Sequence, residues 1–321
     1  MKNNSMKTFA KQFLQEIKNH QYIVIFHHQR PDGDCLGSQQ ALKLWIKKMF
    51  PNKTIYAVGS NENLFPFLNW KFNKIPSNKI LSKALGIVVD ANYANRIICN
   101  ELILENKLKT LIRIDHHPEK DDINYKLRFV DPTYSASAEQ IADLIKLIAP
   151  SSLDKKISQF LYLGIYTDSG RFFYDTTTAR THALVSWLLE SNFKVFDLHK
   201  NLSLRTISEL EFNKYVLSNY KTHKNVIYCF ISYHDIKKLK LKDNNTNRVD
   251  FLANIEGYDI WIFFIQNVDK SIRVRLRSNK FNIAQLAHQY NGGGHKKASG
   301  AIIYDEKEIL EIVKKAALIR D

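Results

Sequence analysis

Short runs of apolar residues alternate with segments of helical periodicity through the first 190 residues of the chain. The apolar runs predict strands at 22–28, 53–58, 85–90 and 109–115. Apolar residues spaced three and four positions apart predict helices at 35–50, 137–149, 153–168 and 178–190. Continuous apolar strands separated by helices are typical of a parallel sheet covered on both faces. We therefore predict an α/β domain over residues 1–190, with a mostly parallel sheet covered by helices.

The pattern changes after residue 190. Residues 191–220 are expected to form a helical connector. Beyond it, the sequence predicts strands at 226–232, 259–266, 271–278 and 298–304, and helices at 282–290 and 306–319. The run SIRVRLRS at 271–278 alternates apolar and polar residues, as a strand with one buried face does. Residues 221–321 are therefore predicted to form a smaller α/β domain with a mixed sheet.

The composition is that of an ordinary soluble protein with room for two domains: 321 residues, 45% hydrophobic and 25% charged. The formal net charge is +15, and the excess of Lys and Arg is denser in the C-terminal third. A basic surface attracts polyanions over a Debye length, although it also aids solubility alone. Charge by itself does not choose between an RNA-binding module and an enzyme that acts on small phosphates.

The three cysteines, Cys35, Cys99 and Cys229, are far apart in the sequence and show no paired spacing. This pattern argues against a disulfide framework and against a cysteine-based zinc site, and it fits a reducing compartment. The first 21 residues lack a continuous apolar run, and no later segment approaches membrane-spanning length. We expect a cytoplasmic protein with no membrane partner.

Acidic and imidazole side chains cluster where the predicted elements end. They are His28, Asp32, Asp34, Asp90, Asp115, His116, His117 and Asp168. The carboxyl ends of parallel strands form the ligand crevice of an open sheet, so most of these groups are expected to converge. Clustered acids repel one another unless cations neutralise them. Carboxylates mixed with imidazoles, without thiolates, suit manganese, with iron, magnesium and zinc left open.

Each of these residues also has a structural interpretation. His27 and His28 are compatible with simple packing in a strand, and Asp32 and Asp34 lie where a helix N-cap is expected. Taken singly, the structural interpretation is favoured at each position. Taken together, in this order and spacing, the residues favour a metal site.

Four segments resemble, in order, the signature motifs of the DHH phosphoesterase family: HQRPDGDCLGS, VVDANYANRI, IDHHPE and YTDSGRF. The segment RVRLRSNKFNIAQLAHQYNGGGHKKASGA is similar to the accessory domain that follows DHH domains in one branch. The resemblance covers nearly the whole chain and is strongest to the NrnA-type branch. Members of that branch act on very short RNAs and on 3′-phosphoadenosine 5′-phosphate (pAp).

The resemblance implies two divalent cations, with manganese preferred and magnesium or others open. It implies that one cation is bound by His28 and Asp32, that the other is bound by Asp34, His116 and Asp168, and that Asp90 bridges them. His28, rather than His27, matches the family's H-x-x-P-D spacing. His117 is expected to face the substrate phosphate and Asp115 to orient its neighbours, which makes both catalytic.

In the C-terminal domain the resemblance implies substrate binding by Arg277, Ser278 and His295, and the run of Gly292, Gly293 and Gly294 indicates a phosphate-binding loop beside them. The residues agree with this, since glycine N–H groups can approach a phosphate and a guanidinium can bind it at two points. A flexible hairpin is the alternative interpretation of the glycines. Many relatives carry a fourth glycine where this chain has Asn291, which tolerates left-handed backbone angles.

The expected function is therefore metal-dependent hydrolysis of short single-stranded oligoribonucleotides, including pApA, to mononucleotides, and of pAp to AMP. No Walker-type phosphate loop and no G-x-S-x-G elbow occurs in the sequence, and none is required for this chemistry. The alternatives are another DHH hydrolase (a single-strand exonuclease, a linear or cyclic dinucleotide phosphodiesterase, a pyrophosphatase) and a non-catalytic RNA-binding protein. A homodimer is left open.

Overall fold

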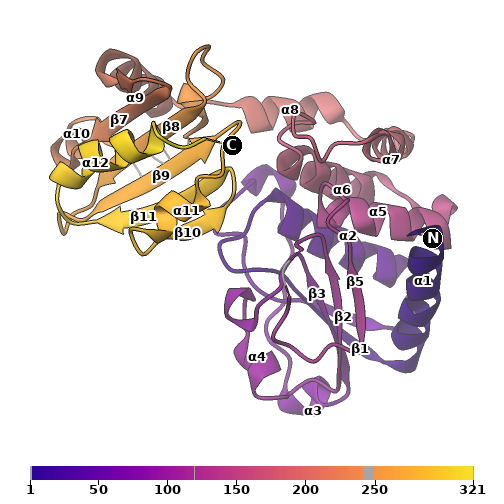
Figure 1. The fold of residues 1–321 in the computed structure, drawn as a ribbon. Helices are drawn as coiled ribbons and strands as arrows, with labels where there is room; N and C mark the ends of the chain where they lie inside the picture. Colours follow the sequence, from indigo (N-terminus) through magenta and orange to yellow (C-terminus); the bar gives the residue numbers. More distant parts are fainter. Residues whose placement is uncertain (1, 119, 242–248, 321) are drawn as a thin grey trace. The chain divides into compact units, whose positions relative to one another are not determined.

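The computed structural model describes residues 2–118, 120–241 and 249–320. The chain divides into two compact units, Met1–Ser203 and Leu204–Asp321 (Figure 1). The boundary lies inside the segment that the sequence predicts as a connector. That segment holds two helices, α8 (Val195–Ser203) in the first unit and α9 (Ile207–Asn219) in the second. Among the described residues, no helix has the length and apolar character needed to cross a bilayer.

The N-terminal unit is built on a five-stranded sheet in the order β2-β1-β3-β4-β5, in which every neighbouring pair is parallel. The strands are β1 (Tyr22–Phe26), β2 (Thr54–Ala57), β3 (Ala84–Val89), β4 (Thr110–Asp115) and β5 (Leu127–Val130). Every residue of the central strand β3 is buried, as expected for a strand covered on both faces. The predicted parallel sheet is confirmed.

Helices and short turns cover the two faces of this sheet. The helices of the unit are α1 (Lys2–Asn19), α2 (Gly33–Met49), α3 (Asn78–Leu81), α4 (Glu101–Leu104), α5 (Ser137–Ile148), α6 (Lys155–Asp168), α7 (Ala179–Leu189) and α8. Ile23 and Ile25 face the core formed with α1, α2, α5 and α6. Val24 and Phe26 face the smaller core formed with α3 and α4. Alternate side chains of β1 therefore contribute to the hydrophobic cores on both faces of the sheet.

The sequence analysis did not predict α1, β5 or the short helices α3 and α4; of these, α1 and β5 lie at the edge of the sheet. Helix α1 buries Phe13 and Ile17 in the main core, although lysines surround these residues in the sequence. Strand β5 is a four-residue edge strand whose burial only partly alternates. Helix α1 and strand β5 lie at the edge of the unit, where the pattern of apolar residues in the sequence is weakest.

Helices α2 and α6 approach closely through two glycines. A Cβ on Gly37 would lie 2.4 Å from the carbonyl oxygen of Phe160. A Cβ on Gly164 would lie 2.5 Å from the Cβ of Ala138 and 2.9 Å from Oδ1 of Asp34. The close approach brings the N-terminus of α2 to the C-terminus of α6, where predicted site residues lie.

The C-terminal unit holds a six-stranded mixed sheet in the order β10-β11-β9-β8-β7-β6, in which only the β7–β8 pair is parallel. The strands are β6 (Lys221–His223), β7 (Val226–Ile231), β8 (Ile260–Gln266), β9 (Ile272–Ser278), β10 (Gly293–His295) and β11 (Ala298–Ile303). Its helices are α9, α10 (Tyr233–Lys238), α11 (Ala284–His288) and α12 (Lys307–Ala316). The predicted mixed sheet is confirmed, and β9 alternates buried and half-buried residues as its sequence indicates.

We predict that Gly37→Ala destabilises the protein by roughly 1–3 kcal/mol, even though alanine gains about 1 kcal/mol in helix propensity. The added methyl group meets a backbone oxygen, which cannot rotate away. Urea unfolding measures the change, with Ser186→Ala at an exposed position of α7 as the control. Equal stability of the two variants would contradict the close contact.

Candidate metal centre

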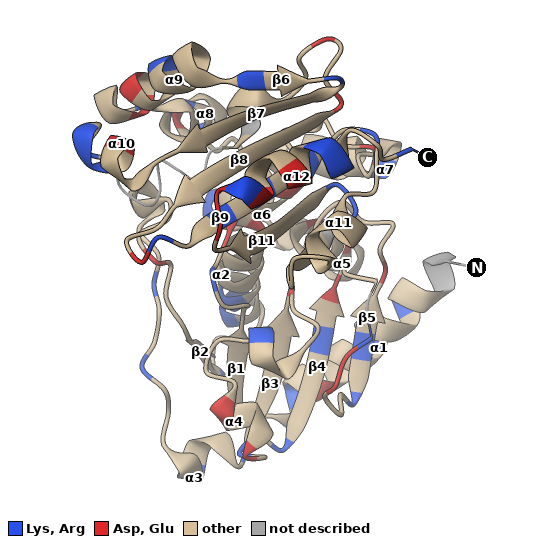
Figure 2. Ribbon diagram, turned by 60° about the vertical axis from the view of Figure 1, so that its left-hand side comes forward, with Lys and Arg blue, Asp and Glu red and all other residues tan. Residues whose placement is uncertain are grey.

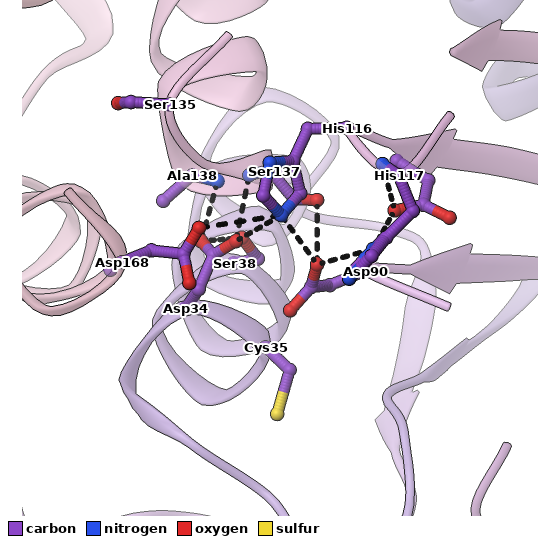
Figure 3. Close-up of polar contacts among 12 residues, drawn as sticks. Asp34, Cys35, Ser38, Asp90, His116, His117, Ser135, Ser137, Ala138 and Asp168 are labelled. Carbon is purple, nitrogen blue, oxygen red and sulfur yellow. Dashed lines mark hydrogen bonds and ion pairs between the residues drawn. The ribbon is translucent and has the colours of Figure 1, made fainter. Parts of the chain in front are cut away.

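The predicted site residues of the N-terminal unit come together at the carboxyl edge of the sheet. Figure 3 shows five of them, Asp34, Asp90, His116, His117 and Asp168. β1 leads into His28, β3 into Asp90, and β4 into Asp115, His116 and His117. Asp32 is the N-cap residue of α2, Asp34 lies in its first turn, and Asp168 ends α6. Asp90 has a left-handed backbone, with φ of 58°, which turns the chain away from the sheet at this point.

Asp90 lies between two imidazoles. Its Oδ2 is 3.4 Å from Nε2 of His28, and its Oδ1 is 3.4 Å from Nε2 of His116. Nε2 of His28 is also 3.4 Å from Oδ2 of Asp32. Nε2 of His116 is 3.4 Å from Oδ2 of Asp168. The donors therefore form two adjacent groups that meet at Asp90, and such groups of carboxylates and imidazoles could hold metal ions.

Backbone contacts hold two of these side chains in an orientation suited to ligation. Nδ1 of His28 is 2.8 Å from the carbonyl oxygen of Gln29, so an Nδ1–H donated there directs Nε2 at the carboxylates, and a cation that displaces the Nε2 proton would find the lone pair directed at the site. The Oδ2 and Oδ1 atoms of Asp34 accept hydrogen bonds from the N–H groups of Ser137 and Ala138, at 2.7 and 2.8 Å. These N–H groups begin α5, where helix donors lack intrahelical partners and the helix dipole favours negative charge.

The electrostatics of the group favour bound positive charge. Burial raises the pKa of Asp34 well above its ordinary value, and the charges of Asp90 and Asp168 add to this. Burial, together with the charge of Asp90, raises the pKa of Asp168 to about 7, although His116 opposes the shift. Burial acts in the same direction on Asp90, but hydrogen bonds with His116 and His28 hold its pKa well below the usual range. Carboxylates that repel in this way are neutralised by cations.

Cys35 is the unexpected member of the group. Its sulfur lies among the ligand atoms of His28, Asp32 and Asp90, all within 4.8 Å of one another. Burial raises the pKa of this thiol, and the charge of Asp32 adds to the shift. In the metal-free protein the thiol is therefore protonated at neutral pH, and the charged donors of the group are the carboxylates. Such a set fits a hard divalent cation.

The neighbouring His27 is buried and belongs to none of these groups, although its Nδ1 lies 3.8 Å from the sulfur of Cys35. Its Nδ1 is 2.7 Å from the carbonyl oxygen of His28, and burial lowers its pKa to about 4. A neutral, fully buried imidazole agrees with the expectation that His27 packs or supports its neighbour.

His117 contacts both Asp115 and the carboxylate group. Nδ1 of His117 is 2.7 Å from Oδ1 of Asp115, which also accepts the His117 N–H at 3.0 Å. Nδ1 of His117 lies 3.5 Å from Oδ1 of Asp90. His117 therefore also forms, with Asp90 and His116, a group of donors that could hold a cation.

Two predicted site residues of the C-terminal unit, Ser278 and Arg277, form hydrogen bonds with the backbone of the unit. The Ser278 hydroxyl is buried; it donates to the carbonyl oxygen of Asp259 and accepts the N–H groups of Lys280 and Phe281, at 3.0, 3.1 and 2.8 Å. Ser278 thus shapes the turn after β9. Nη1 of Arg277 donates to the carbonyl oxygen of Leu276 at 2.8 Å.

Gly292, Gly293 and Gly294 differ in how strongly their surroundings exclude a side chain. A Cβ on Gly292 would lie 2.1 Å from the carbonyl oxygen of Gly300, and one on Gly294 would lie 2.5 Å from that of Ala298. Gly294 also has φ of 135°, whereas a Cβ on Gly293 would make only an ordinary contact, 3.6 Å from Cε1 of His288. Asn291 adopts a left-handed backbone, with φ of 52°, as its residue type allows. The side chain of His295 lies outside the described part of the chain.

Comparison with known proteins agrees with this geometry. Residues 22–165 match the DHH family, N-terminal domain, and residues 223–319 match the DHHA1 domain. The protein of Mycoplasma genitalium named bifunctional oligoribonuclease and PAP phosphatase NrnA is 43% identical, over 94% of each chain. The chain belongs to the DHH family.

More distant matches cover similar shares of the chain. The Bacillus subtilis protein that bears the NrnA name is 32% identical, over 94% of this chain and 95% of its own. A crystal structure of an exopolyphosphatase-related protein from Bacteroides fragilis matches with a TM-score of 0.87, over 97% of this chain and 96% of that one. At 23% identity, this match supports the fold alone. The resemblance drawn from the four sequence segments is confirmed.

Sequence analysis of this DHH chain missed several supporting groups. The hydroxyl of Ser137 donates to Oδ1 of Asp90 at 3.1 Å, next to its N–H contact with Asp34. Arg113, inside β4, donates to Oδ2 of Asp115. An arginine inside an otherwise apolar strand was a signal for such a partner, whereas nothing in the spacing of Ser137 indicated its contacts.

We predict that Mn²⁺ at about 100 times its Kd stabilises the metal-free protein by about 2.7 kcal/mol and raises its Tm by several degrees. Asp90→Asn should lose most of this increment, because the carboxylate shared by the two groups is gone. Asp143→Asn is the matched control, since Asp143 accepts only from Tyr134 among the described contacts. Differential scanning calorimetry with and without Mn²⁺ measures the gain in stability. If Asp90→Asn gains as much as the wild type, Asp90 is not shared by the two groups.

Proposed function

We propose that this protein is a metal-dependent phosphoesterase that hydrolyses short oligoribonucleotides, including pApA, to mononucleotides and converts pAp to AMP. The observation that carries the proposal is Asp90, whose two oxygens each face one imidazole in a group of oxygen and nitrogen donors. The relatives named for oligoribonuclease and PAP phosphatase activity support it, since they are 35–43% identical over most of this chain.

In this proposal the two donor groups each hold one divalent cation. His28 and Asp32 bind one; Asp34, His116 and Asp168 bind the other. Asp90 is shared between them. Manganese is the proposed ion, because the charged donors are carboxylates beside imidazoles and the one nearby thiol is protonated.

The chain's residues then position the ester for attack. Two bound cations would supply a more acidic water and neutralise the charge that develops on the phosphate. Asp115 occupies Nδ1 of His117, which leaves Nε2 as the atom that can donate to a phosphate oxygen. The α5 N–H groups hold Asp34 in place, so its orientation does not depend on the substrate.

We assign substrate binding in the C-terminal unit to Arg277, the glycine hairpin and His295. Gly293 has no side chain, so a phosphate could approach its backbone N–H closely. Ser278 would act through the turn that it shapes. We place the activity in the cytoplasm, where free cysteines such as Cys35, Cys99 and Cys229 are common.

The test is one panel of substrates with purified protein and Mn²⁺: pAp, pApA, five-nucleotide RNA, longer RNA and pyrophosphate. We expect AMP from pAp and pApA, mononucleotides from the short RNA, and little turnover of long RNA or pyrophosphate. Asp90→Ala and His116→Ala should lower turnover at least about a thousandfold, because several kcal/mol of charge stabilisation is lost. Asp143→Asn should remain active. Full activity in either site variant would contradict the metal assignment, and no phosphate-ester cleavage at all would contradict the function.

The role of the C-terminal unit has its own test. Arg277→Gln should raise KM for five-nucleotide RNA about tenfold, with a smaller change in kcat, since the lost contact binds substrate before and during reaction. Lys314→Gln removes the same charge from an exposed position of α12 and should leave KM nearly unchanged. Equal effects of the two variants would show that only net charge matters.

A further inference from the structure

Arg113 is a fully charged side chain buried inside the N-terminal sheet. It lies in the middle of β4 and its side chain is 1% exposed. Its Nε donates to Oδ2 of Asp115 at 3.0 Å, with a second donation from Nη2 to the same oxygen. Its Nη1 donates to Oδ2 of Asp121 at 3.0 Å. A buried guanidinium is tolerated only when it is paired, and here it joins two carboxylates.

The second carboxylate is itself held by another arginine. Arg128 on β5 is the register partner of Arg113, so two like charges stand side by side on neighbouring strands. Figure 2 shows a basic segment on each of these two strands. Nε and Nη2 of Arg128 donate to the two oxygens of Asp121, at 2.9 and 3.1 Å. Asp121 therefore relieves a repulsion that would otherwise open this edge of the sheet.

Asp115 divides its two oxygens between different tasks. Oδ2 accepts from Arg113, and Oδ1 accepts from the backbone and side chain of His117. Asp115 is completely buried, so water does not compete for either oxygen. Any rotation of the carboxylate would break contacts on both sides, and the imidazole orientation follows from the guanidinium.

The residue after Asp121 makes a parallel contact. Oδ1 of Asp122 accepts the N–H of Ala94 at 2.8 Å. Ala94 begins the short turn Ala94–Arg96 that follows Asp90. One loop thus ties down both the segment after Asp90 and, through Arg113, the segment that carries His117.

We propose that Arg113 and Asp121 are positioning residues that fix Asp115 and, through it, the imidazole of His117. The inference rests on the proposed function, in which His117 contacts the substrate phosphate. Neither Arg113 nor Asp121 belongs to the groups that could hold cations. We call the chain of contacts from Asp121 through Arg113 and Asp115 to His117 the relay. Loss of the relay should therefore slow turnover and leave substrate and metal affinity largely intact.

Asp121→Asn is the test variant, because it keeps the shape and removes the charge from a side chain that is 11% exposed. We expect kcat for pApA to fall roughly 10–100-fold, the range seen when groups that orient active-site ligands are changed. KM and the Mn²⁺ affinity from calorimetric titration should change less than about threefold. Asp121→Glu, which restores the charge, should recover part of the lost kcat.

Glu16→Gln is the matched control. It breaks the 2.7 Å ion pair of Glu16 with Lys126, close to the same loop in the sequence, and has no described contact with Asp115 or His117. If Asp121→Asn and Glu16→Gln lower Tm and kcat to the same extent, the relay is only a structural ion pair and the inference is wrong.

A second measurement does not depend on turnover. In metal-free protein with ¹⁵N-labelled histidine, the Nδ1–H of His117 should give a downfield proton signal, assigned by its absence in His117→Gln. Asp121→Asn should shift or broaden it, and Glu16→Gln should not. An unchanged signal in Asp121→Asn overturns the inference. If the wild type cleaves no ester, the proposed function fails, and this signal still decides whether the relay orients His117.

Discussion

The negative charge gathered around Asp90 is the constraint on which this structure depends. The side chains of Asp34 and Asp90 are only 1% and 2% exposed, so water solvates neither carboxylate. The protein offsets part of the cost itself, with the α5 N–H groups on Asp34 and two imidazoles on Asp90. What remains is a shortage of positive charge that suits a divalent cation. The stability of the apo fold and the capacity to bind metal are therefore opposed at this edge of the sheet.

The sheet of the N-terminal unit could be predicted because its strands bury both faces. In β3, six consecutive residues are apolar and buried, so no other element fits the run. Helix α1 carries an equally real periodicity, with Phe9, Phe13 and Ile17 facing the core, but charged and polar neighbours dilute it. Strand β5 could not be predicted, since four residues at an edge are defined by pairing with β4 rather than by their own pattern.

The donors of the site could be predicted because motif spacing fixes where each strand ends. The choice of His28 over His27 followed from its distance to Pro31 and Asp32, and the structure puts His28 against the carboxylates. Cys35 was set aside on sequence spacing alone, although the fold brings its sulfur to the same group. Contacts made by backbone N–H groups, such as those of Ser137 and Ala138, could not be predicted from the sequence, because they do not depend on the residue type. They depend on how α5 meets α2.

The alternation of β4 explains why the chain needs two histidines in succession. Ile112 and Ile114 face the core under the long helices, so His116, in the same phase, reaches Asp34 and Asp168 from α2 and α6. Arg113 and Asp115 face the opposite side, and His117 joins them there. The two rings lie 4.6 Å apart and both approach Oδ1 of Asp90, but a single histidine could not also contact both Asp168 and Asp115. The end of β4 thereby supplies one imidazole to the carboxylates of α2 and α6 and a second imidazole that is held by the buried Asp115.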